Sequence, residues 1–182
     1  MAIWGEKDYI PNIMGASGIT KEQAKTCMYY AMLTYAFIGS RVKLMPILNI
    51  QGPVGTGKSN LLRVLRQIVY DPREIKATSF AGLRDELISG STAIMDEASY
   101  VDEDLLVKRY QISTAKVSFK KRAICGWTTE KTDIFGSTII VRSVPFVDLA
   151  TRSRSITINT KYRPGDYKVV KLDREQFEKK GG

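Results

Sequence analysis

The sequence contains the stretch Gly52-Pro53-Val54-Gly55-Thr56-Gly57-Lys58-Ser59, and the segments around it decide the fold. Before it runs the apolar segment 44–50, which indicates a parallel strand covered on both faces. After it, the apolar residues of segment 61–69 recur at helical spacing. The pattern therefore predicts a strand, a glycine-rich turn and a helix, in that order.

The stretch 52–59 matches the pattern GxxxxGK[ST] at every fixed position. Its glycines let the backbone curl, so that successive N–H groups point inward at phosphate oxygens. Lys58 supplies a point charge for the β and γ phosphates of a nucleotide, and Ser59 supplies a hydroxyl for Mg²⁺. The candidate nucleotide-binding residues are Gly52, Pro53, Val54, Gly55, Thr56, Gly57, Lys58, Ser59 and Asn60.

A second apolar segment, residues 91–95, ends in the acidic pair Asp96 and Glu97. Nucleotide-bound Mg²⁺ needs a carboxylate nearby, so we expect Asp96 to act on the metal together with Ser59. Glu97 is then placed to polarise a water for attack on the γ phosphate. The paired acids favour hydrolysis over phosphoryl transfer to a small acceptor, and the absence of an NKxD segment favours ATP over GTP. We expect an ATPase that uses ATP and Mg²⁺.

Composition narrows the class of protein further. The chain has 182 residues, 43% of them hydrophobic, which suits one soluble globular domain. Histidine is absent, which excludes catalytic triads and metal sites built on imidazole. The two cysteines lie far apart in sequence, and we expect both to be buried free thiols. The net charge of +9 suggests a polyanionic partner such as nucleic acid.

The N-terminal residues lack the order of a signal peptide, and no apolar run is long enough to span a bilayer. We therefore expect a cytoplasmic protein with no membrane partner. The chain is expected to form one domain, residues 1–182. It divides into an N-terminal lead and helix (1–43), a nucleotide-binding core (44–160) and a polar tail (161–182).

The remaining periodicities predict helices at 20–38 and from 102 or 103 to 110, and strands at 75–78, 116–120, 137–141 and 155–159. Strands separated by helices predict an α/β fold with three layers, α/β/α, around a central parallel sheet. Together with the stretch 52–59, this arrangement resembles that of P-loop NTPases. The segment around Val117 is a possible hairpin insertion.

With these motifs, residues 44–160 resemble the AAA+ class of P-loop ATPases, and in particular the helicase-like, superfamily 3 ATPases of phages and mobile elements. The resemblance implies a polar sensor at the end of the fourth strand, which is Ser143 or Arg142 here. It also implies an arginine, Arg154 first and Arg152 second, that reaches the neighbouring subunit's site in a homo-oligomeric ring. Salt bridges to surface acids are the alternative role for these arginines. No C-terminal helical lid is evident, because the tail is short and polar.

The window 108–122 holds six basic residues and no acid, interleaved with Tyr110 and Phe119 and followed by Trp127. Such a mix suits phosphate neutralisation with base stacking on single strands. In the helicases that this chain resembles, a hairpin at the corresponding position in the chain binds DNA. The resemblance therefore makes 108–127 the candidate hairpin. A solvated basic edge strand is the alternative. The candidate nucleic-acid residues are Lys116, Phe119, Lys120, Lys121 and Arg122.

The leading hypothesis is the ATP-hydrolysing motor of a DNA replication helicase or initiator from a phage or other mobile element, acting on single-stranded or duplex DNA. A nucleotide-switched helicase loader or protein-remodelling scaffold with slow turnover is the alternative. The candidate catalytic residues are Lys58, Asp96, Glu97, Ser143, Arg152 and Arg154.

Overall fold

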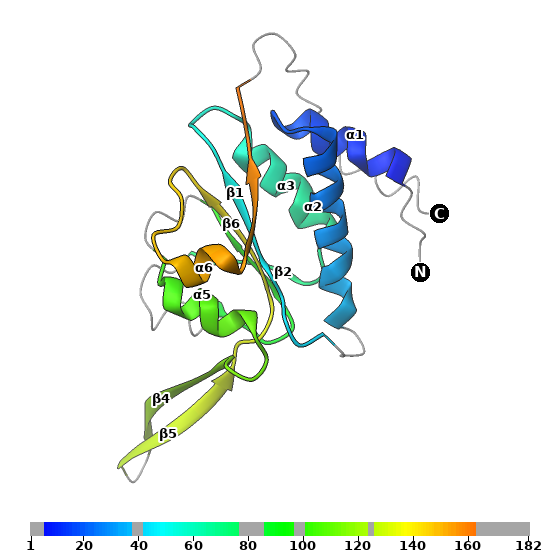
Figure 1. The fold of residues 1–182 in the computed structure, drawn as a ribbon. Helices are drawn as coiled ribbons and strands as arrows, with labels where there is room; N and C mark the ends of the chain where they lie inside the picture. Colours follow the sequence, from blue (N-terminus) through cyan, green and yellow to red (C-terminus); the bar gives the residue numbers. More distant parts are fainter. Residues whose placement is uncertain (1–5, 38–41, 77–85, 97–100, 124–125, 163–182) are drawn as a thin grey trace.

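The structure is a computed structural model that describes residues 6–37, 42–76, 86–96, 101–123 and 126–162 (Figure 1). Its helices are α1 (Glu6–Ala16), α2 (Lys21–Thr34), the 3₁₀ turn η1 (Tyr35–Phe37), α3 (Lys58–Ile68), α5 (Glu103–Tyr110) and α6 (Leu149–Ser153). Its strands are β1 (Ile47–Gln51), β2 (Pro72–Glu74), β3 (Thr92–Met95), β4 (Lys116–Ala123), β5 (Gly126–Asp133), β6 (Ser137–Arg142) and β7 (Ser155–Asn159).

Five of the strands form a parallel sheet in the order β2-β3-β6-β1-β7. Strand β6 is central, and its neighbour β1 pairs with β6 on one side and with β7 on the other, so that Ile47 lies opposite Thr138 and Ser155. Because all five strands run the same way, the segments that follow β1, β3 and β6 leave the sheet at one edge. Ligands of open α/β sheets bind at this carboxyl edge.

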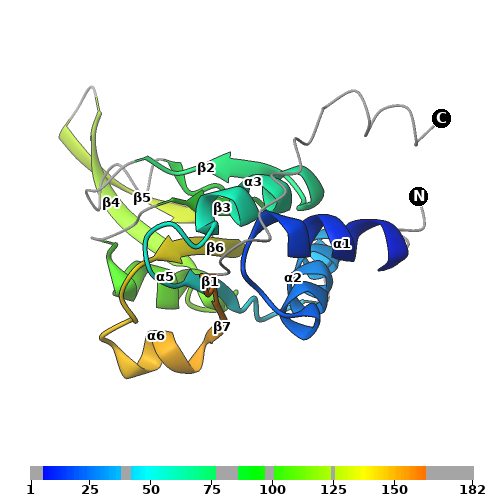
Figure 2. The same ribbon diagram turned by 90° about the horizontal axis from the view of Figure 1, so that it is seen from above.

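Helices cover both faces of the sheet, as Figure 2 shows from above. On β1, Leu48 and Ile50 pack into a core shared with α1, α2 and α3, whereas Ile47 faces a second core that includes residues of α5. The predicted three-layer α/β/α arrangement is confirmed. The part of the chain that the structure describes holds no helix long and apolar enough to cross a membrane. The predicted absence of a lid concerns residues that lie mostly outside the described ranges.

Helix α2 forms as its sequence predicts. The side chain of Thr20 accepts a hydrogen bond from the Gln23 N–H at 3.2 Å, and Gln23 Oε1 accepts one from the Thr20 N–H at 2.9 Å, which completes a capping box. Cys27 is fully buried on this helix, and burial raises the pKa of its thiol to about 12. Its thiol is therefore an inert core group, as expected. Cys125 lies outside the described residues.

Two boundaries differ from the prediction. The strand expected at 75–78 is β2, at Pro72–Glu74, where it forms the edge of the sheet beside β3. Proline is tolerated at an edge, and two of the three residues are exposed, so β2 has little apolar pattern to reveal it. The hairpin predicted at 108–127 consists of β4 and β5, so it begins at Lys116 and ends at Asp133.

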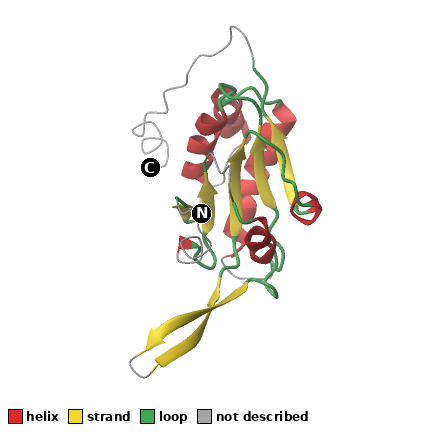
Figure 3. Ribbon diagram, turned by 90° about the vertical axis from the view of Figure 1, so that its left-hand side faces the viewer, coloured by secondary structure: helices red, strands yellow, loops and turns green. Residues whose placement is uncertain are grey.

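The β4–β5 hairpin projects from the body of the molecule at the end of the sheet opposite the carboxyl edge (Figures 1 and 3). Its strands are antiparallel from the Lys116–Asp133 pair to the Ala123–Gly126 pair. At the base, Ala115 and Val117 are buried with Ile134 and Phe135 in the second core. The hairpin is thus rooted in the core and leaves it as a two-stranded arm.

The side chain of Arg109, the penultimate residue of α5, fastens this root. It is 0% exposed, and burial lowers the pKa of its guanidinium to about 10. It donates hydrogen bonds to the backbone carbonyls of Ile88, Ser91, Ile134 and Ser137. These carbonyls lie before β3, at the end of the hairpin and at the start of β6, so one cation joins α5, the sheet and the hairpin.

Arg109→Met should lower the free energy of unfolding by about 3 kcal/mol, because four carbonyls, three of them buried, lose a charged donor. Lys108→Met is the matched control. Lys108 lies next in the chain, but its ammonium pairs with Asp104 at 2.6 Å at an exposed site, so its loss should cost less than about 0.5 kcal/mol. Urea unfolding measures both values. Equal losses in the two variants would contradict the role given to Arg109.

Candidate functional site

Residues 52–57, the predicted phosphate loop, connect the end of β1 to the start of α3 at the carboxyl edge of the sheet. Gly57 precedes the helix in the left-handed conformation, with φ of 84°, and no side chain caps the helix N-terminus. The first N–H groups of α3 therefore lack a side-chain acceptor and carry the positive end of the helix dipole. This geometry suits a phosphate group.

Thr160, just beyond β7, holds the loop in place. A Cβ on Gly52 would lie 2.2 Å from Thr160 Oγ1 and 2.6 Å from its carbonyl oxygen, so only glycine fits there. The Thr160 and Thr56 hydroxyls lie 2.6 Å apart, and the Thr160 N–H donates to Gln51 O at 2.7 Å. The turn out of β1 is thus fixed by contact with the neighbouring strand. Thr160 carries no sequence signal and was missed by the sequence analysis.

Lys58 folds back over the loop that precedes it. Its Nζ atom donates to the carbonyl oxygens of Gly52 at 2.8 Å and Pro53 at 2.7 Å. The ammonium group is therefore held within the curve of the loop. A phosphate oxygen is a stronger acceptor for it than a neutral carbonyl, because both partners are then charged.

Ser59 and Asp96 meet at this edge although they come from different elements. The Ser59 hydroxyl in the first turn of α3 donates to Asp96 Oδ1 at 3.3 Å, just beyond β3. A hydroxyl and a carboxylate suit Mg²⁺, which usually takes its remaining ligands from water and phosphates. The described residues contain no cluster of three or more His, Cys, Asp or Glu that would cage a metal by themselves. Glu97 lies outside the described residues.

The end of β6 lies beside the loop, since Arg142 pairs in register with Gln51. Ser143 follows directly and is exposed at the same edge. The Arg142 guanidinium is buried, contacts Glu103 Oε1 at 3.0 Å and lies 4.4 Å from the centre of the Phe146 ring. The Arg142 guanidinium is thus already bound to Glu103 and Phe146 of its own chain, whereas Ser143 is exposed to solvent.

Glu103 also ties α5 to the segment after β6. Its carboxylate accepts hydrogen bonds from the N–H groups of Val147 at 3.4 Å and Asp148 at 2.9 Å. The first turn of α5 therefore depends on the residues that leave the carboxyl edge of β6.

The structure does not bring Arg154 to the phosphate loop of its own chain. The Arg154 carbonyl accepts a hydrogen bond from the Ile47 N–H at the start of β1, whereas the loop follows the end of that strand. Five residues of strand correspond to about 16 Å. The Arg154 side chain donates to Ala150 O at 2.8 Å and lies 5.6 Å from the centre of the Tyr110 ring. Arg152 is exposed on α6.

The candidate nucleic-acid residues all lie on β4, away from the loop. Lys116 is exposed at the root of the hairpin, and on β5 the side chain of Trp127 is 71% exposed. The side chains of Phe119, Lys120, Lys121 and Arg122 lie outside what the structure describes. The predicted residues of the loop and those of the hairpin therefore lie at opposite ends of the sheet (Figure 1), and Arg152 and Arg154 belong to neither group.

Two structures of JC virus (JCV) helicase, each with a bound small molecule, share this fold. One is 15% identical with a TM-score of 0.54, and the match covers 88% of this chain and 47% of the helicase chain. The other is 13% identical with a TM-score of 0.54, over 98% and 51% of the two chains. The chain thus spans about half the length of these helicase chains. The predicted AAA+ P-loop resemblance is confirmed at the level of the fold.

The Holliday junction branch migration motor RuvB of Thermotoga maritima also matches, with a lower TM-score. It is 17% identical with a TM-score of 0.46, over 78% of this chain and 45% of the RuvB chain. No family model matches the sequence. No curated protein matches it either.

Proposed function

We propose that this chain is an ATP-hydrolysing motor domain that acts on DNA, the ATPase part of a replication helicase or initiator of a phage or other mobile element. The observation that carries the proposal is the meeting of the phosphate loop, Lys58 and the Ser59–Asp96 pair at the carboxyl edge of a parallel sheet. The fold shared with JCV helicase supports it.

In this proposal the chain binds the triphosphate through the loop N–H groups, the N-terminus of α3 and the Lys58 ammonium. Ser59 and Asp96 would hold Mg²⁺, which supplies positive charge to the β and γ phosphates when bound. Glu97 orients a water molecule and accepts its proton as the water oxygen bonds to the γ phosphorus and the bond to the β–γ bridging oxygen breaks. Ser143 is the candidate that contacts the γ phosphate from β6.

Helix α5 is the proposed connection between hydrolysis and the hairpin. Its first residue, Glu103, binds Arg142 beside the phosphate loop, and its penultimate residue, Arg109, binds Ile134 at the root of the hairpin. An eight-residue helix is a rod of about 12 Å. A displacement at the nucleotide end would therefore move the hairpin root, and with it Lys116, Phe119, Lys120, Lys121 and Arg122, which we propose to contact DNA.

We also propose that Arg154 acts on the site of a neighbouring copy in a ring. The position of Arg154 at the far end of β1 supports action between copies rather than within one. An arginine that stabilises charge on the transferred phosphoryl group raises the rate by about 10³ to 10⁵. Arg152, which is exposed two residues earlier, is the second candidate.

A nucleotide-switched loader or remodelling scaffold is the second candidate function. It is favoured by the contacts of Arg154 with Tyr110 and Ala150, because these contacts must break before the guanidinium can serve a neighbour. In that case the basic hairpin binds a protein and turnover is slow.

Steady-state ATPase activity of the wild type should rise with protein concentration and with added single-stranded DNA. Glu97→Gln should lower it by about 10² to 10⁴, because the water loses its proton acceptor. Asp104→Asn is the matched control, since Asp104 is an exposed acid on α5. ATP binding without turnover in any condition would contradict the motor and favour the switched scaffold.

Mixing two inactive variants tests action between copies. Lys58→Ala loses its own phosphate contact, and Arg154→Ala loses the group offered to its neighbour. A mixture should regain ATPase activity that neither variant has alone, because some interfaces then combine an intact loop with an intact Arg154. The same mixture with Arg152→Ala tests the second candidate. If both mixtures stay inactive, or if both arginine variants are fully active alone, trans action is wrong.

A further inference from the structure

The sheet face that β1 and β7 present toward α6 is unexpectedly polar. Asn49 and Gln51 alternate along β1 with Leu48 and Ile50, which pack on the opposite face with α3. The register pairs Asn49 with Thr157 and Gln51 with Asn159. Faces of parallel strands in three-layer folds are normally apolar. These four polar side chains therefore form a polar patch on a face where packing alone would favour apolar residues.

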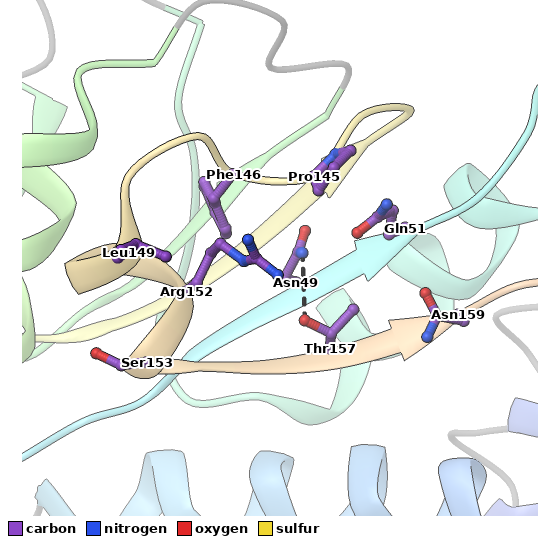
Figure 4. Close-up of a pocket in the computed structure, with 9 residues that line it drawn as sticks. All are labelled: Asn49, Gln51, Pro145, Phe146, Leu149, Arg152, Ser153, Thr157 and Asn159. Atoms are coloured by element: carbon purple, nitrogen blue, oxygen red, sulfur yellow. Dashed lines mark hydrogen bonds between the residues drawn. The ribbon is translucent and has the colours of Figure 1, made fainter.

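This polar patch forms the floor of a pocket with a volume of about 630 Å³ (Figure 4). Ligand sites usually measure about 300 to 1,000 Å³. The walls come from α6 and the segment before it, namely Pro145, Phe146, Leu149, Arg152 and Ser153. The pocket combines an apolar side with several hydrogen-bonding groups, as small-molecule sites do.

The side-chain oxygen of Asn49 is an unsatisfied hydrogen-bond acceptor in this pocket. Its side chain is 2% exposed, and its Nδ2 donates to Thr157 Oγ1 at 3.4 Å. Its Oδ1 has no partner among the described residues. In Figure 4 the Asn49 side chain points into the pocket beside the end of Arg152. A buried acceptor without a donor costs folding free energy, so a ligand that donates an N–H or O–H to this oxygen would be stabilised there.

Of the nine residues that line the pocket, only Arg152 is charged. Within the described ranges no carboxylate pairs with its guanidinium. The nearest acid in sequence, Asp148, is occupied, because it caps α6 by accepting from the Thr151 N–H at 2.7 Å and the Thr151 hydroxyl at 2.8 Å. These hydrogen bonds lower the pKa of Asp148, so it stays ionised and bound to Thr151. The pocket thus carries one positive charge, and no carboxylate of the described residues balances it.

We propose that this pocket binds a small organic carboxylate that also carries an amide or amino N–H. The carboxylate would pair with Arg152, and the N–H would donate to Asn49 Oδ1. A single cation matches a monoanion, and Asp148 already caps the N-terminus of α6 through the Thr151 N–H, so this helix end is not open to a phosphate. A free N-acyl amino acid and the carboxy-terminus of a peptide share this chemistry.

The proposal does not rest on the proposed function. The pocket lies on the face of β1 opposite α3, and none of its lining residues belongs to the stretch 52–59. Arg152 is shared with the proposed function only as the second candidate for action between copies. An ATPase that fails to bind a carboxylate, or the reverse outcome, would separate the two proposals.

Amide chemical-shift mapping on the ¹⁵N-labelled full chain tests the pocket with four probes: N-acetylglycine, N-acetylglycinamide, triglycine and inorganic phosphate. N-acetylglycine should shift the Asn49 side-chain amide and the Thr157 N–H, with a Kd of about 1 mM for so small a ligand. N-acetylglycinamide, which lacks the carboxylate, should not shift them. Tighter binding of triglycine would identify the peptide source, whereas equal or weaker binding would identify the free molecule.

Arg152→Ala should weaken N-acetylglycine binding at least about 10-fold, because a charge-assisted hydrogen bond is lost. Arg73→Ala is the matched control, since Arg73 is exposed on β2 at the other edge of the sheet. Thr157→Val should weaken binding less. Three results would overturn the proposal: no shifts with any carboxylate, equal shifts with the neutral amide, or pocket shifts that follow protein concentration without a probe and so assign the pocket to a second copy.

Discussion

The parallel pairing of β1 with β6, and of β6 with β3, is the constraint on which the rest of the structure depends. Parallel strands end at the same edge, so Gly52, Asp96 and Ser143 come to one place from three distant parts of the chain. Thr160, beyond β7, then fixes the turn at Gly52 by direct contact. The phosphate loop is therefore shaped by its neighbours as much as by its own glycines.

Polar groups placed inside an apolar core explain how the two ends of the molecule are joined. Burying a guanidinium is expensive unless its donors find acceptors. Both terminal nitrogens of Arg109 donate to backbone carbonyls, from three segments in all, whereas its Nε has no partner among the described residues. At the other end of α5, Glu103 holds Arg142 beside the loop. The helix is thus anchored at both ends by charged groups that have specific partners, which makes it suited to transmit displacement.

Local patterns predicted the parts of the molecule that local physics determines. The phosphate loop, Asp96 at the end of a strand and the capped helix α2 could all be read from residues close in sequence. The limits of β2 and of the hairpin could not, because the sequences of Pro72–Glu74 and Gly126–Asp133 show no alternation of apolar and polar residues to mark them. Thr160, Arg109 and Asn49 were missed because their roles depend on contacts between segments far apart in the chain.

The most direct test of the central claim is calorimetric titration of Mg·ATP into the wild type and into Lys58→Met, with Arg63→Met as an exposed control on the same helix α3. The account predicts that the wild type and the control bind alike and that Lys58→Met binds about 10 to 150 times more weakly, the value of one hydrogen bond to a charged group. Equal affinity in all three proteins would contradict it, because ATP would then bind away from residues 52–59.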